Sequence, residues 1–127
     1  MRRTLLDYLE DMQASALEVL DFTRGMTFEE FLRDRKTINA VLRSLEVLGE
    51  AAKRIPRGVR ARHSDIPWRD VAGMRDKLIH EYHGVDLEIV WRTVQEDVPA
   101  LLPRIEKVLA EERARERPEP KKDRGRK

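Results

Sequence analysis

The sequence contains no cysteine, little glycine or proline, and no long apolar run. Without cysteine the chain has no disulfide framework, no thiolate nucleophile and no zinc site built from cysteines. Its six glycines and six prolines leave room for long helices. No segment approaches the ~18 apolar residues of a membrane span, and acidic residues begin at Asp7, before any apolar run reaches signal length. We therefore expect a cytoplasmic protein without a membrane segment.

Charge is abundant but nearly balanced. Charged residues make up 39% and hydrophobic residues 40% of the 127 residues, which is typical of one folded domain. The net charge of +2 is unevenly distributed, because residues 111–127 carry +3 and residues 1–110 carry −1. A uniformly basic DNA-binding surface is therefore not expected, although a local basic pocket or the tail can still meet phosphates.

Apolar residues recur at helical spacing along nearly the whole chain, and no alternating strand pattern is found. These stripes predict four main helices, at residues 3–22, 38–55, 67–79 and 86–112. Thr27 with Glu30 fits a capping box for a further short helix, and Asp86 fits an N-cap for the last one. Pro99 and Pro103 should bend that last helix, because each lacks an amide hydrogen.

The predicted fold is therefore all-α, an antiparallel bundle of four main helices joined by short connecting helices. The connector PRGVRARHSD, residues 56–65, is basic and leads to Pro67. The helical domain is expected to span residues 1–112. Residues 113–127 are too charged to bury apolar surface and are expected to form a solvated tail. Trp68 and Trp91 are interpreted as packing anchors.

The segment RDKLIHEYHG, residues 75–84, mixes charged, aromatic and apolar side chains. At ~100° per residue, Arg75 and Tyr82 fall inside the apolar arc of the predicted helix, whereas Asp76 and His80 fall on the other side. Arg75 and His80 are then about 140° apart, so a straight helix cannot direct both to one ligand atom. Either the helix ends or bends near His80, or a second subunit completes the site.

A guanidinium in an apolar arc requires a hydrogen-bonded partner. The candidates for Arg75 are Glu46 and Glu50 of the preceding long helix, or a second subunit that flanks this one. Arg43, Glu46 and Glu50 recur at spacings of three and four residues. Ordinary ion pairing along the helix would explain this spacing, and so would support for Arg75 in a cleft.

Two simpler interpretations of the segment remain open. Arg75 could be a paired structural arginine and Tyr82 an aromatic residue at the edge of the core. Asp76, His80 and His83 share one face, which would also fit a metal site, because neighbouring helical turns can supply ligands.

Arg75, His80 and Tyr82 match the Arg-x4-His-x-Tyr signature, and at these residues the sequence resembles HepT-type toxins of the HEPN superfamily. Three surrounding segments are similar to that family as well: RSLEVLGEAAKRIP at 43–56, DIPWRDVAGMRDKLIHEYHGVDLEIVW at 65–91 and TVQEDVP at 93–99. The resemblance covers residues 3–110 and does not include the charged tail. It implies a HEPN-like helical bundle.

The resemblance also implies a metal-independent endoribonuclease without a cofactor, the toxin of a type VII-like toxin–antitoxin pair, active as a homodimer whose paired signature helices form a cleft. Its catalytic residues would be Arg75 and His80. Arginine suits bidentate phosphate binding, and histidine can exchange a proton near neutral pH. Asp76 could orient the imidazole of His80, with Tyr82, Glu50, Glu46 and Arg43 in supporting positions.

The partner implied by the resemblance is a nucleotidyltransferase antitoxin of the MntA type, which attaches AMP to Tyr82 and silences the toxin. In the alternative interpretation the protein still binds a nucleotidyltransferase, but it is a catalytically weak helical adaptor or a nucleotide-binding subunit. Helical bundles host all of these functions, so the fold does not distinguish between them.

Overall fold

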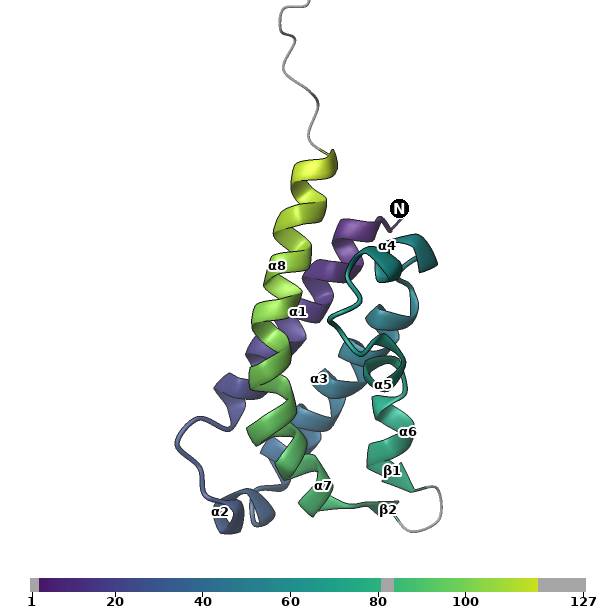
Figure 1. The fold of residues 1–127 in the computed structure, drawn as a ribbon. Helices are drawn as coiled ribbons and strands as arrows, with labels where there is room; N and C mark the ends of the chain where they lie inside the picture. Colours follow the sequence, from purple (N-terminus) through teal and green to yellow (C-terminus); the bar gives the residue numbers. More distant parts are fainter. Residues whose placement is uncertain (1–2, 81–83, 117–127) are drawn as a thin grey trace, which may run out of the picture.

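The structure, a computed structural model, describes residues 3–80 and 84–116 (Figure 1). Its longest helices are α1 (Leu5–Phe22), α3 (Arg35–Lys53) and α8 (Val98–Glu116). The shorter helices are α2 (Phe28–Leu32), α4 (Arg57–Arg62), α5 (Trp68–Ala72), α6 (Met74–Leu78) and α7 (Leu87–Arg92). The chain direction alternates from α1 to α3, then to α5 with α6, and then to α7 with α8 (Figure 1). The predicted all-α antiparallel bundle is confirmed.

Side-chain caps fix where the first helices begin. Thr4 and Asp7 form a reciprocal capping box at α1, and Thr27 and Glu30 form the predicted one at α2. Each box satisfies amide hydrogens that a helix start leaves without partners. The carboxylate of Asp86 accepts bonds from the backbone of α7, which confirms the predicted N-cap.

One apolar core joins the long helices. Helix α1 packs against α3 and α8, and α3 also packs against α5 and α6. Trp91 lies at the edge of this core with its ring 5.1 Å from that of Phe31, and Trp68 is buried with its indole N–H donated to the carbonyl of His63. Both tryptophans are therefore packing anchors, as expected. The residues with no exposed surface are Leu9, Met12, Ala16, Val19, Phe31, Val41, Leu45, Leu48, Ala52, Val90, Val98 and Ile105.

The basic connector contains one of the expected short connecting helices, α4, which begins directly after Pro56. The next segment differs from the sequence-based prediction. The helix expected at residues 67–79 is instead two short helices, α5 and α6, separated by a turn at Gly73. After α6 the chain forms a strand, β1 (Ile79–His80), which pairs antiparallel with β2 (Gly84–Val85). Two-residue strands are too short to show an alternating pattern, so apolar periodicity does not reveal them.

Near the two prolines the last helix is irregular, and the irregularity is a wider helical turn just before Pro99. A π-helix, η1 (Thr93–Asp97), lies between α7 and α8, and the amide of Val98 bonds to the carbonyl of Thr93. Pro99 follows at once and has no amide hydrogen to continue the α-helical pattern. Pro103 lies inside α8. The last helix thus consists of α7, η1 and α8.

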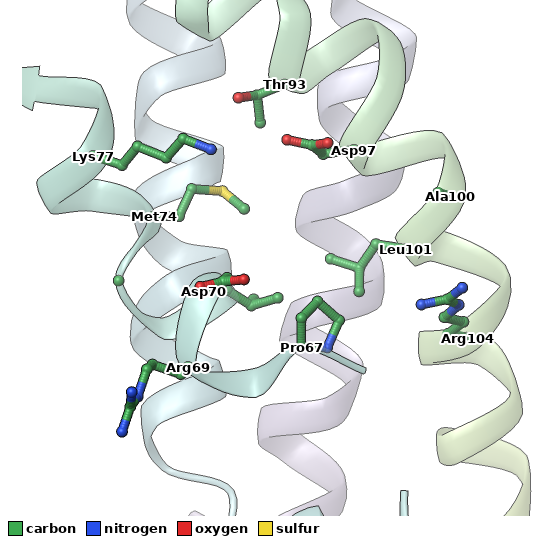
Figure 2. A pocket seen from close by; sticks show the side chains of 12 residues that line it. Pro67, Arg69, Asp70, Met74, Lys77, Thr93, Asp97, Ala100, Leu101 and Arg104 are labelled. Atoms are coloured by element: carbon green, nitrogen blue, oxygen red, sulfur yellow. The ribbon is translucent and has the colours of Figure 1, made fainter. Parts of the chain in front are cut away.

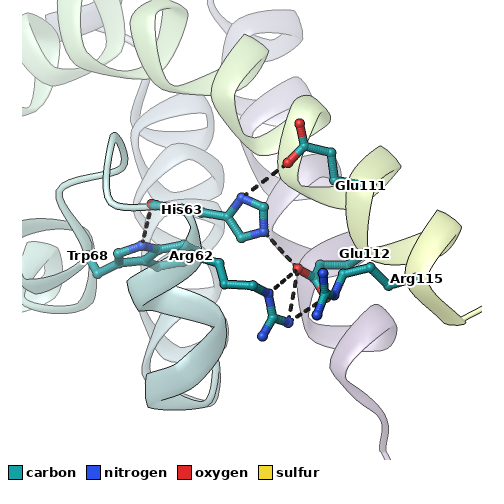
Figure 3. A network of polar contacts seen from close by, with 6 residues as sticks. All are labelled: Arg62, His63, Trp68, Glu111, Glu112 and Arg115. Atoms are coloured by element: carbon teal, nitrogen blue, oxygen red, sulfur yellow. Dashed lines mark hydrogen bonds and ion pairs between the residues drawn. The ribbon is translucent and has the colours of Figure 1, made fainter.

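Helix α8 continues to Glu116, past the expected domain boundary at residue 112. Its end is tied to the preceding part of the chain by a buried polar network (Figure 3). Glu112 is 2% exposed and accepts bonds from His63 Nε2 at 2.7 Å and Arg62 Nη2 at 3.0 Å. Arg115 lies 3.7 Å from the same carboxylate. None of the helices within residues 3–80 and 84–116 is long and apolar enough to cross a membrane.

Candidate functional site

The site is built on the short helix α6, which carries the first residue of the Arg-x4-His-x-Tyr signature. Met74 and Leu78 are buried and fix α6 against the bundle, while Arg75, Asp76 and Lys77 between them are exposed. One turn of helix separates the two anchors, so the residues between them face away from the core. The short helix therefore presents its charged residues on the molecular surface.

Arg75 is paired with an acidic residue of α3. Its Nε donates to Glu46 Oε2 at 2.7 Å, and the other carboxylate oxygen of Glu46 lies 3.6 Å from Arg43. The predicted contact from the preceding long helix, α3, to Arg75 is therefore confirmed for Glu46. Glu50, the other candidate, is 3.5 Å from Lys53 of its own helix. Both interpretations of the spacing therefore apply, because carboxylates of α3 pair along their own helix and Glu46 also binds Arg75.

The expectation that Arg75 lies in an apolar arc is wrong, because its side chain is 52% exposed. The turn at Gly73 is the physical reason. The wheel that placed Arg75 beside Val71 assumed one continuous helix, whereas the turn interrupts the regular 100° step between them. The guanidinium has five N–H donors, and the contact with Glu46 occupies Nε. Among the described residues, no contact to its two terminal nitrogens is found.

The helix ends before His80, as one of the two sequence-based alternatives required. Leu78 closes α6 and His80 pairs with Gly84 in the β-ladder, where Gly84 has a φ of +79°. Asp76 is exposed on α6, but the helical i,i+4 relation predicted between it and His80 is wrong, because His80 belongs to the strand. The predictions for Tyr82 and His83 lie outside the described residues.

A pocket of about 410 Å³ opens beside Arg75 along α3. It is lined by three arginines, three carboxylates, an aromatic residue and two apolar residues: Arg43, Arg54, Arg75, Asp11, Glu46, Glu50, Tyr8, Val47 and Ala51. Asp11 is paired with Arg3, whose guanidinium also lies 5.0 Å from the centre of the Tyr8 ring. With three arginines and three carboxylates, the pocket at the signature arginine is polar and balanced in charge rather than basic. Arg54 and Tyr8 were not identified from the sequence.

A larger cavity, of about 640 Å³, lies between the α5 and α6 segment and the η1 and α8 segment (Figure 2). Met74 and Leu101 form part of its apolar wall, and Lys77 extends into it toward Thr93 and Asp97 of the π-helix (Figure 2). Of the predicted site residues that the structure describes, none lines this cavity. The signature arginine therefore belongs to the smaller, more polar pocket.

The buried network at Glu112 is a second cluster of ionisable groups, but it lies between α4 and α8 rather than at the signature (Figure 3). Burial alone would raise the pKa of Glu112, yet the bonds from His63 and Arg62 outweigh it and leave the pKa below its usual value. Glu112 is therefore held as a carboxylate that joins the two helices. No group of three metal-binding side chains is found in the part of the chain that the structure describes.

Comparison with known proteins gives a consistent result. The family model described as "Ribonuclease HepT-like" matches residues 12–108. A protein of Thermococcus cleftensis named "Probable ribonuclease HepT" is 52% identical over 109 residues, which cover 85% of this chain and 98% of that protein. A relative named "Putative RNase" from Caldanaerobacter subterraneus is 40% identical over 87% of this chain and 99% of its own. Another protein of that name, from Methanocaldococcus jannaschii, is 45% identical over 86% of this chain and 87% of its own length.

No solved structure gives a match. The family assignment therefore stands on the sequence match, which spans the signature helix and the strand after it, and on the helical fold that the resemblance implied. This chain belongs to the HepT-like ribonuclease family.

Proposed function

We propose that this protein is a metal-independent endoribonuclease and the toxin of a toxin–antitoxin pair. The observation that carries the proposal is the state of Arg75. Its side chain is 52% exposed beside a polar pocket, and its one contact among the described residues, from Nε to Glu46, leaves the terminal nitrogens available. A planar, permanently charged fork in this arrangement suits a phosphodiester oxygen pair.

The proposed reaction is attack of a ribose 2′-oxygen on the adjacent phosphorus. The 2′-hydroxyl loses its proton, the new P–O2′ bond forms, and the P–O5′ bond breaks. The products are a 2′,3′-cyclic phosphate and a 5′-hydroxyl that receives a proton. His80 is assigned the proton transfer, because an imidazole can take or give a proton near neutral pH, and Arg75 stabilises the charge that develops on phosphorus.

Arg75 and His80 belong to different elements, since Arg75 lies on α6 and His80 lies in β1. We propose that a homodimer completes the cleft by bringing two such segments together, with Asp76, Glu50 and Arg43 in supporting positions. RNA would then meet residues of both subunits.

Cleavage of RNA by purified protein in excess chelator tests this function. Wild type is expected to cleave, and His80→Ala is expected to lose about 10²–10⁴-fold in rate, which is the usual contribution of general acid–base catalysis. Arg75→Ala should lose activity as well. Arg24→Ala is the matched control, because Arg24 has an exposed ion pair with Asp21, analogous to that of Arg75 with Glu46. Equal background cleavage in wild type, His80→Ala and Arg75→Ala would reject the enzyme and favour the adaptor.

The proposal includes silencing by adenylylation of Tyr82 by a nucleotidyltransferase antitoxin. A phosphate placed near Arg75 would occupy the guanidinium with the wrong anion. Incubation with that partner and ATP should add one adenylyl group by intact mass and abolish cleavage. Tyr82→Phe should gain no mass, whereas Tyr8→Phe, which alters the only other tyrosine of the sequence, should be modified normally. Adenylylated protein that cleaves at the unmodified rate would contradict this regulation.

A further inference from the structure

The face of α3 beside Arg75 carries two further arginines. Taking ~100° per residue, Arg54 lies about 20° from Arg43 around the helix, and Glu46 lies within roughly 80° of both. All three line the same pocket as Arg75. At ~1.5 Å per residue, Arg43 and Arg54 are about 16 Å apart along the axis, with Glu46 between them. One helix face thus places guanidiniums on both sides of the contact that holds Arg75.

The carboxylates along this face are already neutralised. Glu46 pairs with Arg75 and Arg43, Glu50 pairs with Lys53, and Asp11 pairs with Arg3. The lining as a whole is balanced, with three arginines and three carboxylates, but among the described residues no carboxylate pairs with Arg54, and Arg43 shares Glu46 with Arg75. The positive charge available to an anion is therefore that of Arg54 and of the loosely paired Arg43.

Arg43 and Arg54 are also accessible. The side chain of Arg43 is 75% exposed, and its one ion pair is the long contact of 3.6 Å with Glu46. Arg54 is exposed at the end of α3, and no ion pair to it is found among residues 3–80 and 84–116. A loosely paired arginine exchanges its partner for a stronger anion at little cost, because an exposed ion pair contributes only ~0–1 kcal/mol.

We propose that Arg43 and Arg54 bind the phosphates of the RNA strand on the two sides of the phosphodiester held by Arg75. This assignment rests on the proposed ribonuclease function and identifies the strand path on each subunit, along α3. Successive phosphates of one strand of a duplex repeat every ~3.4 Å along its axis, so a span of about 16 Å accommodates several of them. The face would recognise the backbone rather than the bases, because guanidiniums bound to phosphate carry no sequence information.

The test measures RNA binding separately from cleavage. All variants are made in a His80→Ala background, so that a short fluorescently labelled single-stranded RNA stays intact, and affinity is measured by anisotropy at several salt concentrations. Each lost phosphate contact should reduce the slope of log affinity against log salt by about 0.7. Arg54→Ala and Arg43→Ala are each expected to show that reduction, and the double variant about twice as much.

Two controls separate a local contact from a change in net charge. Arg33→Ala removes the same charge from an exposed position at the end of α2, outside the pocket, and should leave the slope unchanged. Arg54→Lys keeps the positive charge in the pocket and should keep most of the slope. Circular dichroism checks that each variant is folded.

The failure of this assignment is distinct from failure of the proposed function. If the parent binds RNA but Arg54→Ala and Arg43→Ala have the slope of Arg33→Ala, the strand path along α3 is wrong even when wild type cleaves. A change in molar mass of these variants would place the face between copies of the chain and would also overturn it. If wild type does not cleave while the slopes change as expected, the binding face stands and the ribonuclease proposal falls.

Discussion

Glu112 provides the sharpest prediction about stability, because it is a 2%-exposed carboxylate that joins α8 to α4. Glu112→Gln preserves the shape but removes the charge that His63 and Arg62 share. A hydrogen bond to a charged group contributes ~1.5–3 kcal/mol to stability, and a neutral one about 0.5–1.5 kcal/mol. Replacing the carboxylate by an amide therefore weakens each of the two bonds by roughly 1–1.5 kcal/mol. The bond from the buried His63 loses this amount in full. The bond from Arg62 loses less, because its side chain is 39% exposed and solvent screens the interaction. The expected loss is about 2 kcal/mol.

For 127 residues, an unfolding entropy of ~2.1 cal/mol/K per residue converts this loss to a decrease in Tm of about 7 °C. Thermal unfolding by circular dichroism at neutral pH measures it. Glu111→Gln is the matched control, since the adjacent Glu111 contacts the same histidine at 3.5 Å but is 50% exposed. That control should lose no more than about 4 °C, as exposed pairs contribute ~0–1 kcal/mol. Equal losses in the two variants would refute the reasoning.

The same comparison has a predicted pH dependence. The pKa of Glu112 is lowered in the folded protein, because the bonds from His63 and Arg62 outweigh the opposing effect of burial. A lowered carboxyl pKa stabilises the fold above the unfolded value of 4.5, and this contribution is lost as the pH falls through the folded pKa. The difference in Tm between wild type and Glu112→Gln should therefore be largest near neutral pH and shrink below pH 4.5. A constant difference down to strongly acidic pH would contradict the ionised state.

Three further predictions concern the site and the bundle. Glu46→Gln weakens the contact that orients Arg75, so kcat for RNA cleavage should fall about tenfold, for a loss near 1.4 kcal/mol, with Tm unchanged; an unchanged kcat would contradict a positioning role. Gly49→Ala places a methyl group 3.2 Å from the backbone oxygen of Val71, and the overpacking of about 1–3 kcal/mol offsets the ~1 kcal/mol that alanine gains over glycine in a helix. A denaturant titration should therefore show a net loss of up to about 2 kcal/mol, and a gain in stability would refute the close approach of α3 and α5. Light scattering should give twice the chain mass of 14.9 kDa, and a monomeric mass in cleaving protein would contradict the dimer cleft.

The sequence predicted the parts of the fold that local patterns determine. Apolar spacing located α1 and α3, and the hydroxyl and carboxylate caps located the starts of α2 and α7. The break at Gly73 was missed, because an isolated glycine inside a helical pattern does not by itself predict a turn. The sequence offers Glu46, Glu50 or a second subunit as the partner of Arg75, and the choice of Glu46 depends on the tertiary contact between α3 and α6.

The roles of Glu112 and Arg54 depend on tertiary contacts that the composition of the sequence does not reveal. Glu112 stands at the start of a run of charged residues, and for that reason it was read as the edge of a solvated tail. The spacing contained a signal, since Leu101, Ile105 and Val108 form a buried stripe that Glu112 continues at an interval of four. Arg54 was missed because a single exposed arginine at a helix end carries no pattern, and its place in the pocket appears only when α3 and α6 are packed together.

The central claim is that the chain itself cleaves RNA through its 2′-hydroxyl, without a metal. The most direct measurement is mass spectrometry of the new ends formed when wild type cleaves a short RNA in excess chelator. The expected ends are a 2′,3′-cyclic phosphate and a 5′-hydroxyl, and the same strand with 2′-deoxyribose throughout should not be cleaved. A 3′-hydroxyl with a 5′-phosphate, or cleavage of the deoxy strand, would contradict it.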